Sequence, residues 1–147
     1  IINTLCVTLC GAERIFPAPE RLLEAGAEGL APIRAGFRVK YLLDAAEKTA
    51  YGEIDPERIR ALPHQEALAA LKGIKGVGDK VANCVLRFGY GVMDAFPVDV
   101  WVKKGIAGCY GEDFTPKRFG EYAGIAQKYL FCYERNFKSR VRETADM

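Results

Sequence analysis

The chain has 147 residues, of which half are hydrophobic and 27% are charged, and its net charge at pH 7 is +2. This length and composition suit one globular domain with a working core. The small net charge excludes nucleic-acid binding through overall attraction alone, so any such affinity has to come from a local basic surface and directed backbone amides. The five cysteines are an odd number and form no C-x-x-C pair, which argues against a disulfide framework and a zinc site.

Neither a signal segment nor an apolar run long enough to cross a membrane occurs in the sequence. We therefore expect a soluble protein of the cell interior that has no membrane partner. The sequence opens at Ile1 on an apolar stretch that we interpret as the end of a helix. We expect the domain to begin before this residue.

Helical patterns follow one another along the chain. Ile2, Leu5, Cys6 and Leu9 recur at helical spacing up to Gly11, and the segment FPAPERLLEAG has the proline and glycine punctuation of a second short helix. The clearest amphipathic pattern covers residues 38–50. Further helices are predicted at 65–72, 79–88, 99–107, 116–133 and near the C-terminus. Strand-like alternation is absent, so the sequence predicts an all-α fold, a compact bundle of short helices in a single domain over residues 1–147.

A very short turn, Lys75-Gly76-Val77-Gly78, separates two of the predicted helices. Its glycines allow positive φ angles and close approach, and its backbone N–H groups are expected to point outward. Such amides at a helix N-terminus bind anions, and a DNA phosphate is one that can be held without reading a base. A tight turn between helices without any ligand is the structural alternative.

Lys80 falls in the first turn of the helix that follows, where its charge meets the positive end of the helix dipole. A structural lysine gains nothing from this position. An amine nucleophile does gain, because the dipole and desolvation raise the neutral fraction that can attack carbon. A solvated surface lysine is the alternative.

Asp99 follows the rigid Pro97-Val98 step in the segment DAFPVDVWV, at the beginning of another predicted helix. A helix cap is the structural interpretation. The functional interpretation is that the fixed carboxylate stabilises positive charge on a deoxyribose as its base departs, and moves protons around the amine.

Together, IKGVGDK, KVANC and FPVDVW resemble the helix-hairpin-helix DNA glycosylases. Lysine at position 80 resembles the bifunctional branch of that superfamily, which cleaves the glycosidic bond through a Schiff base and then nicks the strand by β-elimination. Within this branch, KVANC, AGIAQKYLF and a tryptophan, Trp101, directly after PVDV are most similar to the bacterial form of 8-oxoguanine DNA glycosylase.

The resemblance implies a slot for an extruded base, with Cys84 against one face, Phe131 against the other and Gln127 on the pairing edge. The spacing is compatible with this, because Lys80 and Cys84 are four residues apart on one helix, as are Gln127 and Phe131. Taken singly, the three residues fit a buried cysteine, a solvated glutamine and a core phenylalanine.

The segment AGFRVKYL resembles the loop that this superfamily inserts into DNA. The resemblance implies that Phe37 fills the gap left by the base and that Arg38 reads the orphaned partner, whereas the residue types alone fit a core phenylalanine and a surface arginine. It also places Lys75, Gly76, Gly78 and Trp101 on the DNA. A structural cation could be held by the backbone carbonyls of the hairpin, which here match Lys72, Ile74 and Val77.

These observations predict base excision repair of 8-oxoguanine in double-stranded DNA by a monomeric N-glycosylase and AP lyase of the bacterial cytoplasm, with Lys80 and Asp99 as catalytic residues. No cofactor is expected to be required, and the cysteine spacings do not match an iron–sulfur cluster. The amino-terminal β-rich domain of the family has no counterpart in this sequence. Two alternatives stay open: a DNA-binding module without catalysis, and a glycosylase for a different damaged base.

Overall fold

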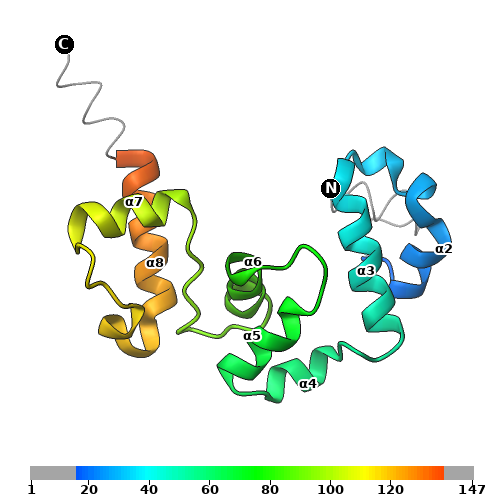
Figure 1. Ribbon diagram of the computed structural model, residues 1–147, viewed down its shortest axis with the longest axis horizontal. Helices are drawn as coiled ribbons and strands as arrows, with labels where there is room; N and C mark the ends of the chain where they lie inside the picture. The colour runs from blue at the N-terminus through cyan, green and yellow to red at the C-terminus, as the bar shows by residue number, and fades with distance from the viewer. Residues whose placement is uncertain (1–15, 138–147) are drawn as a thin grey trace, which may run out of the picture. The chain divides into compact units, whose positions relative to one another are not determined.

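The computed structural model describes residues 16–137. Helices joined by turns and loops make up this part of the chain, and it contains no strand. The all-α prediction is confirmed. The helix predicted at residues 2–11 lies outside the described residues, as does any helix beyond residue 137. The chain forms two compact units, residues 1–77 and 78–147, and each is described by itself (Figure 1).

The first unit is built on two neighbouring helices, α2 (Pro19–Gly29) and α3 (Val39–Ala50), which lie side by side in Figure 1. Proline at the first position starts α2, because its missing N–H would have no helical partner there. The apolar residues predicted for one face of α3 pack on α2 and on the short 3₁₀ turns between the helices. The resulting core contains Leu22, Leu30, Ile33, Ala35 and Ala46, with Leu23, Val39, Leu42 and Leu43 against them.

Two shorter helices, α4 (Pro56–Ala61) and α5 (His64–Lys72), complete this unit. The sequence analysis missed α4, although its start carries a strong signal. Asp55 accepts a hydrogen bond from the Glu57 N–H at 2.9 Å, and Pro56 occupies the first helical position. An aspartate–proline pair at a chain turn is therefore enough to begin a helix of six residues.

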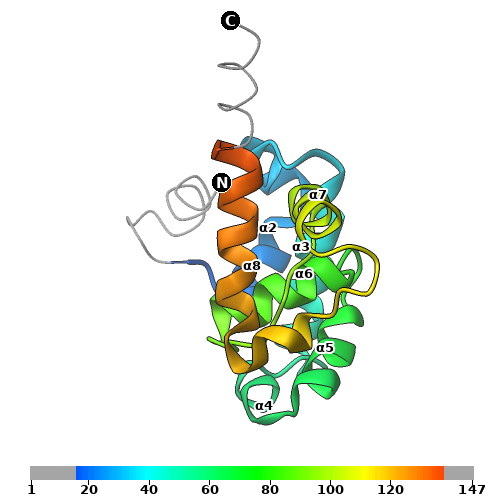
Figure 2. The same cartoon turned by 90° about the vertical axis from the view of Figure 1, so that its left-hand side faces the viewer.

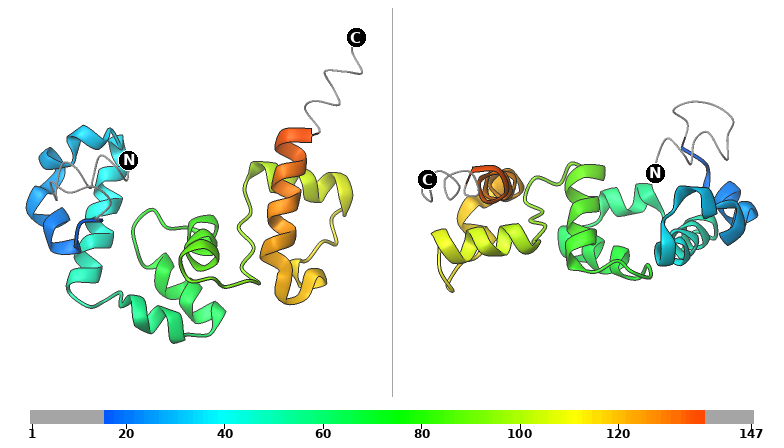
Figure 3. Two further views of the ribbon diagram at one scale, coloured as in Figure 1. Left: turned by 180° about the vertical axis from the view of Figure 1, so that it is seen from behind. Right: turned by 90° about the horizontal axis from the view of Figure 1, so that it is seen from above.

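The second unit contains α6 (Asp79–Cys84), α7 (Val100–Cys109) and α8 (Ala123–Cys132). Helix α7 packs against α8, which continues into a final π-helical turn, Tyr133–Phe137 (Figures 2 and 3). Four rings, those of Phe96, Tyr110, Phe114 and Phe119, form a contiguous aromatic cluster in this unit. They adjoin a buried core of Phe96, Val102, Ala123 and Leu130.

Two of the predicted helices differ in detail from the structure. The segment predicted as one helix over 116–133 is a 3₁₀ segment, Pro116–Tyr122, followed by α8. The 3₁₀ segment has a kink at Gly120, whose φ of 56° is not helical, and α2 has a similar kink at Gly26, whose φ is 58°. The helix predicted at 79–88 has the expected extent, but its last part, Val85–Gly89, is a π-helical turn. None of the helices in residues 16–137 has the length and apolar character needed to cross a bilayer.

Candidate active site

A pocket of about 260 Å³ in the second unit brings together the five residues predicted for catalysis and base recognition. Its lining residues come from α6 and the turn after it, from the segment before α7, and from α8; they are Lys80, Cys84, Phe88, Pro97, Asp99, Gln127, Lys128 and Phe131. The volume lies just below the range of about 300–1,000 Å³ for pockets that hold drug-sized ligands, which suits a single base. Three of the lining residues, Phe88, Pro97 and Lys128, were not predicted as site residues from the sequence.

Helix α6 supplies the amine and the thiol. Lys80 is in its first turn and Cys84 is its last residue, so the four-residue spacing brings both side chains to the same pocket. Lys80 is exposed and Cys84 is partly buried. Among the described residues Lys80 forms no ion pair, which leaves its amine available for chemistry at the pocket.

The carboxylate of Asp99 caps α7. Its Oδ1 accepts hydrogen bonds from the backbone N–H groups of Trp101 at 3.0 Å and Val102 at 2.9 Å. The structural interpretation of this residue is therefore correct. Within the described part of the chain, Oδ2 has no hydrogen-bond partner, so one oxygen fixes the side chain while the other can act in the pocket that Lys80 also lines.

Asn83 connects α6 to the segment that leads to Asp99. Its Oδ1 accepts a hydrogen bond from the Phe96 N–H at 3.3 Å, and its Nδ2 donates to the Asp79 carbonyl at 2.8 Å. The sequence analysis assigned no role to Asn83, because its contact with Phe96 depends on a fold that brings residues 13 positions apart together. The side chain holds the lysine-bearing helix at a fixed position relative to the segment with the acid.

Helix α8 supplies the predicted base-recognition residues. Gln127 is buried, at 7% exposure, and its amide forms no hydrogen bond to any described residue. The amide atoms are not among the fully buried unpartnered atoms of the described residues, so they reach the pocket, where water or a ligand can bond to them. Phe131 lies one turn later, partly buried, and lines the same pocket.

The residues predicted to enter DNA lie in the first unit. Phe37 is 64% exposed, which is contrary to a role in the core, and its ring contacts Tyr41 edge-on with a centroid distance of 5.9 Å. The guanidinium of Arg38 lies 4.7 Å from the centroid of the Phe37 ring. The two side chains thus form an exposed aromatic and cationic pair at the start of α3.

Asp44 of α3, which the sequence analysis did not identify, anchors the turn at residues 73–76. The side chain is buried, and it accepts a hydrogen bond from the Lys75 N–H at 2.8 Å. It also forms ion pairs with the amines of Lys48 and Lys75, each at 3.2 Å. The Lys75 backbone bond, together with hydrogen bonds from the two amines, holds the pKa of Asp44 below its ordinary value.

The turn differs from the prediction in two respects. Not all of its amides point outward, because the Lys75 N–H donates to Asp44 and the Val77 N–H donates to the Ile74 carbonyl at 3.1 Å. Gly76 does need to be glycine, with a φ of 80° and no room for a Cβ, which would lie 2.5 Å from the Tyr41 ring. Gly78 needs neither property: its φ is −98° and an added Cβ meets no atom within 4 Å.

Two further predictions concern the hairpin carbonyls and Trp101. The carbonyl of Ile74 accepts the Val77 N–H, which uses one of its two lone pairs and leaves the other for a cation. A cation held by the carbonyls of Lys72, Ile74 and Val77 stays a prediction. Trp101 is 36% exposed at the start of α7, and the amine of Lys104 lies 4.9 Å from its ring centroid. This arrangement presents a ring and a positive charge at one end of the helix.

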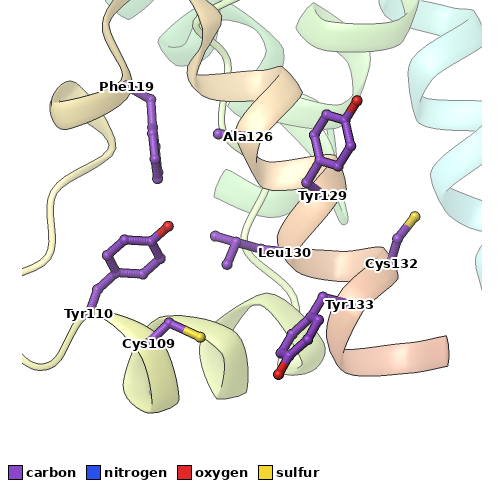
Figure 4. Close-up of a pocket in the computed structure, with 8 residues that line it drawn as sticks. All are labelled: Cys109, Tyr110, Phe119, Ala126, Tyr129, Leu130, Cys132 and Tyr133. Carbon is purple, nitrogen blue, oxygen red and sulfur yellow. The ribbon is translucent and has the colours of Figure 1, made fainter. Parts of the chain in front are cut away.

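A larger pocket in the same unit, about 600 Å³, is lined by Cys109, Tyr110, Phe119, Ala126, Tyr129, Leu130, Cys132 and Tyr133. Figure 4 shows Leu130 pointing from α8 toward Tyr110 and Phe119, while Cys132 points away from them. These residues include no amine, carboxylate or amide side chain. The smaller pocket is therefore the candidate active site.

Comparisons with known proteins identify relatives of the chain. It is 34% identical over 140 residues to N-glycosylase/DNA lyase OGG1 of Arabidopsis thaliana, which covers 81% of the chain. The structure of MBOgg1 in complex with a low affinity DNA ligand matches 93% of the chain with a TM-score of 0.82 and 36% identity. The 8-oxoguanine glycosylase/lyase of Clostridium acetobutylicum, in complex with double-stranded DNA containing cytosine opposite 8-oxoG, matches 90% with a TM-score of 0.77 and 33% identity.

No protein-family model matches the chain. It spans 38% of the length of the Arabidopsis protein, and it covers 53% and 52% of the two solved structures. The sequence identities to these proteins, 34%, 36% and 33%, are nevertheless similar, and both solved structures share the fold of the chain. The chain belongs to the helix-hairpin-helix superfamily of DNA glycosylases.

Proposed function

We propose that the chain excises 8-oxoguanine from double-stranded DNA and then cleaves the strand as an AP lyase. One observation carries the proposal: a single pocket is lined by an amine without an ion-pair partner among the described residues, a fixed carboxylate and a glutamine amide that forms no hydrogen bond to any residue in that part of the chain. The relatives support this choice of lesion, because the Clostridium protein is an 8-oxoguanine glycosylase/lyase.

Recognition begins when the damaged base rotates out of the duplex into the pocket. Cys84 and Phe131 come from different helices and line it together, so they can take the two faces of a flat purine. Gln127 can both donate and accept hydrogen bonds, and it meets the pairing edge of the base. The exposed Phe37 and Arg38 fill the space left in the duplex and contact the orphaned partner.

Excision follows from the amine and the carboxylate. The lone pair of the Lys80 Nζ forms a bond to C1′ of the deoxyribose while the bond from C1′ to the base breaks and its electron pair leaves with the purine, which takes up a proton. Asp99 stabilises the positive charge that develops on the sugar. Proton loss from the lysine nitrogen and opening of the sugar ring give an imine between Lys80 and C1′.

Strand cleavage uses the same imine. A proton leaves C2′, the electrons of that bond form a double bond toward C3′, and the bond from C3′ to the 3′ phosphate oxygen breaks. Water then hydrolyses the imine and frees Lys80. We propose that these steps require no cofactor, that a cation at the hairpin carbonyls would only bind DNA phosphate, and that the protein acts as a monomer in the bacterial nucleoid.

Borohydride trapping on a duplex with 8-oxoguanine opposite cytosine tests the proposal. Reduction of the imine should join protein and DNA covalently, and Lys80→Gln should abolish the adduct while Lys117→Gln, which changes an exposed lysine outside the pocket, should retain it. Trapping by Lys80→Gln at the level of the unaltered chain would remove this lysine from the mechanism.

The same experiment separates the two other functions. A DNA-binding module without catalysis would bind the duplex and give no adduct under any condition. A glycosylase for a different base would give an adduct with another lesion in a panel of oxidised purines and alkylated bases placed opposite cytosine and adenine.

A further inference from the structure

The outer edge of the candidate pocket carries two residues that the proposed mechanism does not use. Phe88, in the π-helical turn after α6, is 63% exposed, and Lys128 is exposed on α8. Both line the pocket, and the amine of Lys128 lies 5.7 Å from the centroid of the Phe88 ring. The two side chains therefore connect the edge formed by α6 and its turn to the edge formed by α8.

This edge is positively charged. The guanidinium of Arg87 lies 5.9 Å from the centroid of the same Phe88 ring, so two cations share one aromatic side chain. Lys128 forms no ion pair with any residue in the described part of the chain. The ring orients the lysine through its negative face without neutralising its charge, so the ammonium group can still bind an anion.

The chemistry of the pocket indicates which anion this is. If Lys80 reaches C1′ of the extruded nucleotide, the sugar lies at the mouth of the pocket and the phosphates attached to it lie just outside. A lysine is a flexible point charge with three donors, which suits a phosphate better than a planar base edge. The base edge already meets Gln127, which is buried whereas Lys128 is exposed.

We propose that Lys128, oriented by the Phe88 ring, binds a backbone phosphate of the extruded nucleotide at the mouth of the pocket. The assignment rests on the proposed function, because it places the extruded sugar at Lys80. Lys128 is then a binding residue that holds the damaged strand while the amine attacks. Its contribution depends on salt and not on the identity of the base.

Equilibrium binding to a duplex with a non-cleavable abasic analogue, measured by fluorescence anisotropy over a series of salt concentrations, tests this assignment. One phosphate contact contributes about 0.9 to the slope of log K against log salt, which corresponds to about eightfold in affinity at 0.1 M salt relative to 1 M. Lys128→Met should reduce the slope by about this amount, and Lys128→Arg should restore it. Lys117→Met, on an exposed lysine outside the pocket, should leave the slope unchanged.

Phe88→Leu removes the ring and keeps the lysine, so it should weaken binding by less than Lys128→Met and retain most of the slope. An unchanged slope in Lys128→Met would overturn the assignment. It would also be overturned if that variant lost affinity for a duplex with 8-oxoguanine but kept it for the duplex with the abasic analogue, because Lys128 would then contact the base and not the phosphate.

The outcomes also distinguish this inference from the proposed function. If the unaltered chain binds the duplex but excises no base, and Lys128→Met still lowers the slope, the phosphate contact stands and the enzymatic proposal falls. If the chain excises 8-oxoguanine and the slope does not change, only the phosphate contact falls. Failure of the unaltered chain to bind any duplex would overturn both.

Discussion

At Asp99 the two oxygens of one carboxylate have different surroundings. Oδ1 accepts two backbone N–H groups and fixes the side chain at the start of α7, whereas Oδ2 has no hydrogen-bond partner in the described part of the chain. The cap therefore does not compete with the proposed catalytic role of Asp99, and it would hold the acid in place without the entropy loss of ordering a free side chain during that reaction. A substitution that keeps the cap and removes the charge can separate the two functions.

Asp99→Asn is that substitution, because asparagine caps helices about as well as aspartate. We expect the melting temperature to stay within about 2 °C of the unaltered chain and the rate of base excision to fall by about 10²- to 10⁴-fold, the usual contribution of a positioned acid or base. Single-turnover excision of 8-oxoguanine and thermal unfolding measure the two quantities. An unchanged excision rate would leave the residue with its capping function alone.

Gly76 and Gly78 provide a matched pair in the same turn. Gly76→Ala should destabilise the chain by at least about 1–2 kcal/mol, because alanine pays the steric cost of a positive φ and its Cβ would also overlap the Tyr41 ring. Gly78→Ala should change the free energy of unfolding by less than about 0.5 kcal/mol, since the residue has an ordinary φ and open space around the added carbon. Urea unfolding of the two variants measures the difference, and equal losses would contradict the local geometry.

At the scale of elements, Asn83 sets the position of α6 relative to the segment before α7. Its side chain accepts the Phe96 N–H and donates to the Asp79 carbonyl, so it is a positioning residue that does not line the pocket itself. Catalysis depends on the distance between amine and acid, and a displacement of about 1 Å can cost about 10²-fold in rate.

Asn83→Ala should lower kcat by about 10- to 100-fold and leave the affinity for a non-cleavable duplex within about twofold, because no DNA contact is removed. Asn83→Asp should recover only part of the loss, because its carboxylate can still accept the Phe96 N–H but cannot donate to the Asp79 carbonyl. Excision kinetics at saturating enzyme, together with duplex affinity, provide both values. If the alanine variant lost affinity and rate in the same proportion, a positioning function would be wrong.

The helices and much of the site could be predicted from the sequence because they depend on local spacing. The four-residue intervals from Lys80 to Cys84 and from Gln127 to Phe131 place each pair on one helical face, whatever the rest of the chain does. That the two pairs line one pocket depends on how α6 and α8 pack. The family resemblance supplied that expectation, and the spacing did not.

What the sequence did not predict depends on contacts between distant residues. Asp44 reads as one polar residue of an amphipathic helix until the fold brings the Lys75 N–H to it, 31 positions away. Lys128 reads as a solvated lysine until Phe88 lies beside it. The break at Gly120 was missed for a different reason, because glycine tolerates both helical and positive φ angles and only the chain path decides between them.

At the scale of the whole molecule, each of the two units has its own buried cluster. The predicted DNA-inserting residues Phe37 and Arg38 belong to the first unit, and the pocket with Lys80 belongs to the second. The net charge of the whole chain is only +2, which is too small for a strong overall attraction to DNA. Binding therefore depends on the local cations in each unit.

Acid provides a way to perturb the first unit selectively. The pKa of Asp44 is lowered by the Lys75 backbone N–H and by its two lysine partners, so the folded state binds a proton less readily than the unfolded state does. The stabilisation is fully present above the ordinary value near 3.8 and is lost as the pH falls through the lowered value in the folded protein. All of these partners lie in the first unit.

As the pH falls below 3.8, amide hydrogen exchange should therefore lose protection in α3 and in the turn at residues 73–77 before it does so in α7 and α8. Asp44→Asn cannot form the ion pairs, so it should be less stable at pH 7 but should show a smaller further loss on acidification. Exchange measured at pH 5, 4 and 3 on both proteins, after correction for the intrinsic pH dependence of exchange, makes the comparison. Equal acid sensitivity of the two proteins would show that other carboxylates control this transition, because asparagine has no proton to gain as the pH falls.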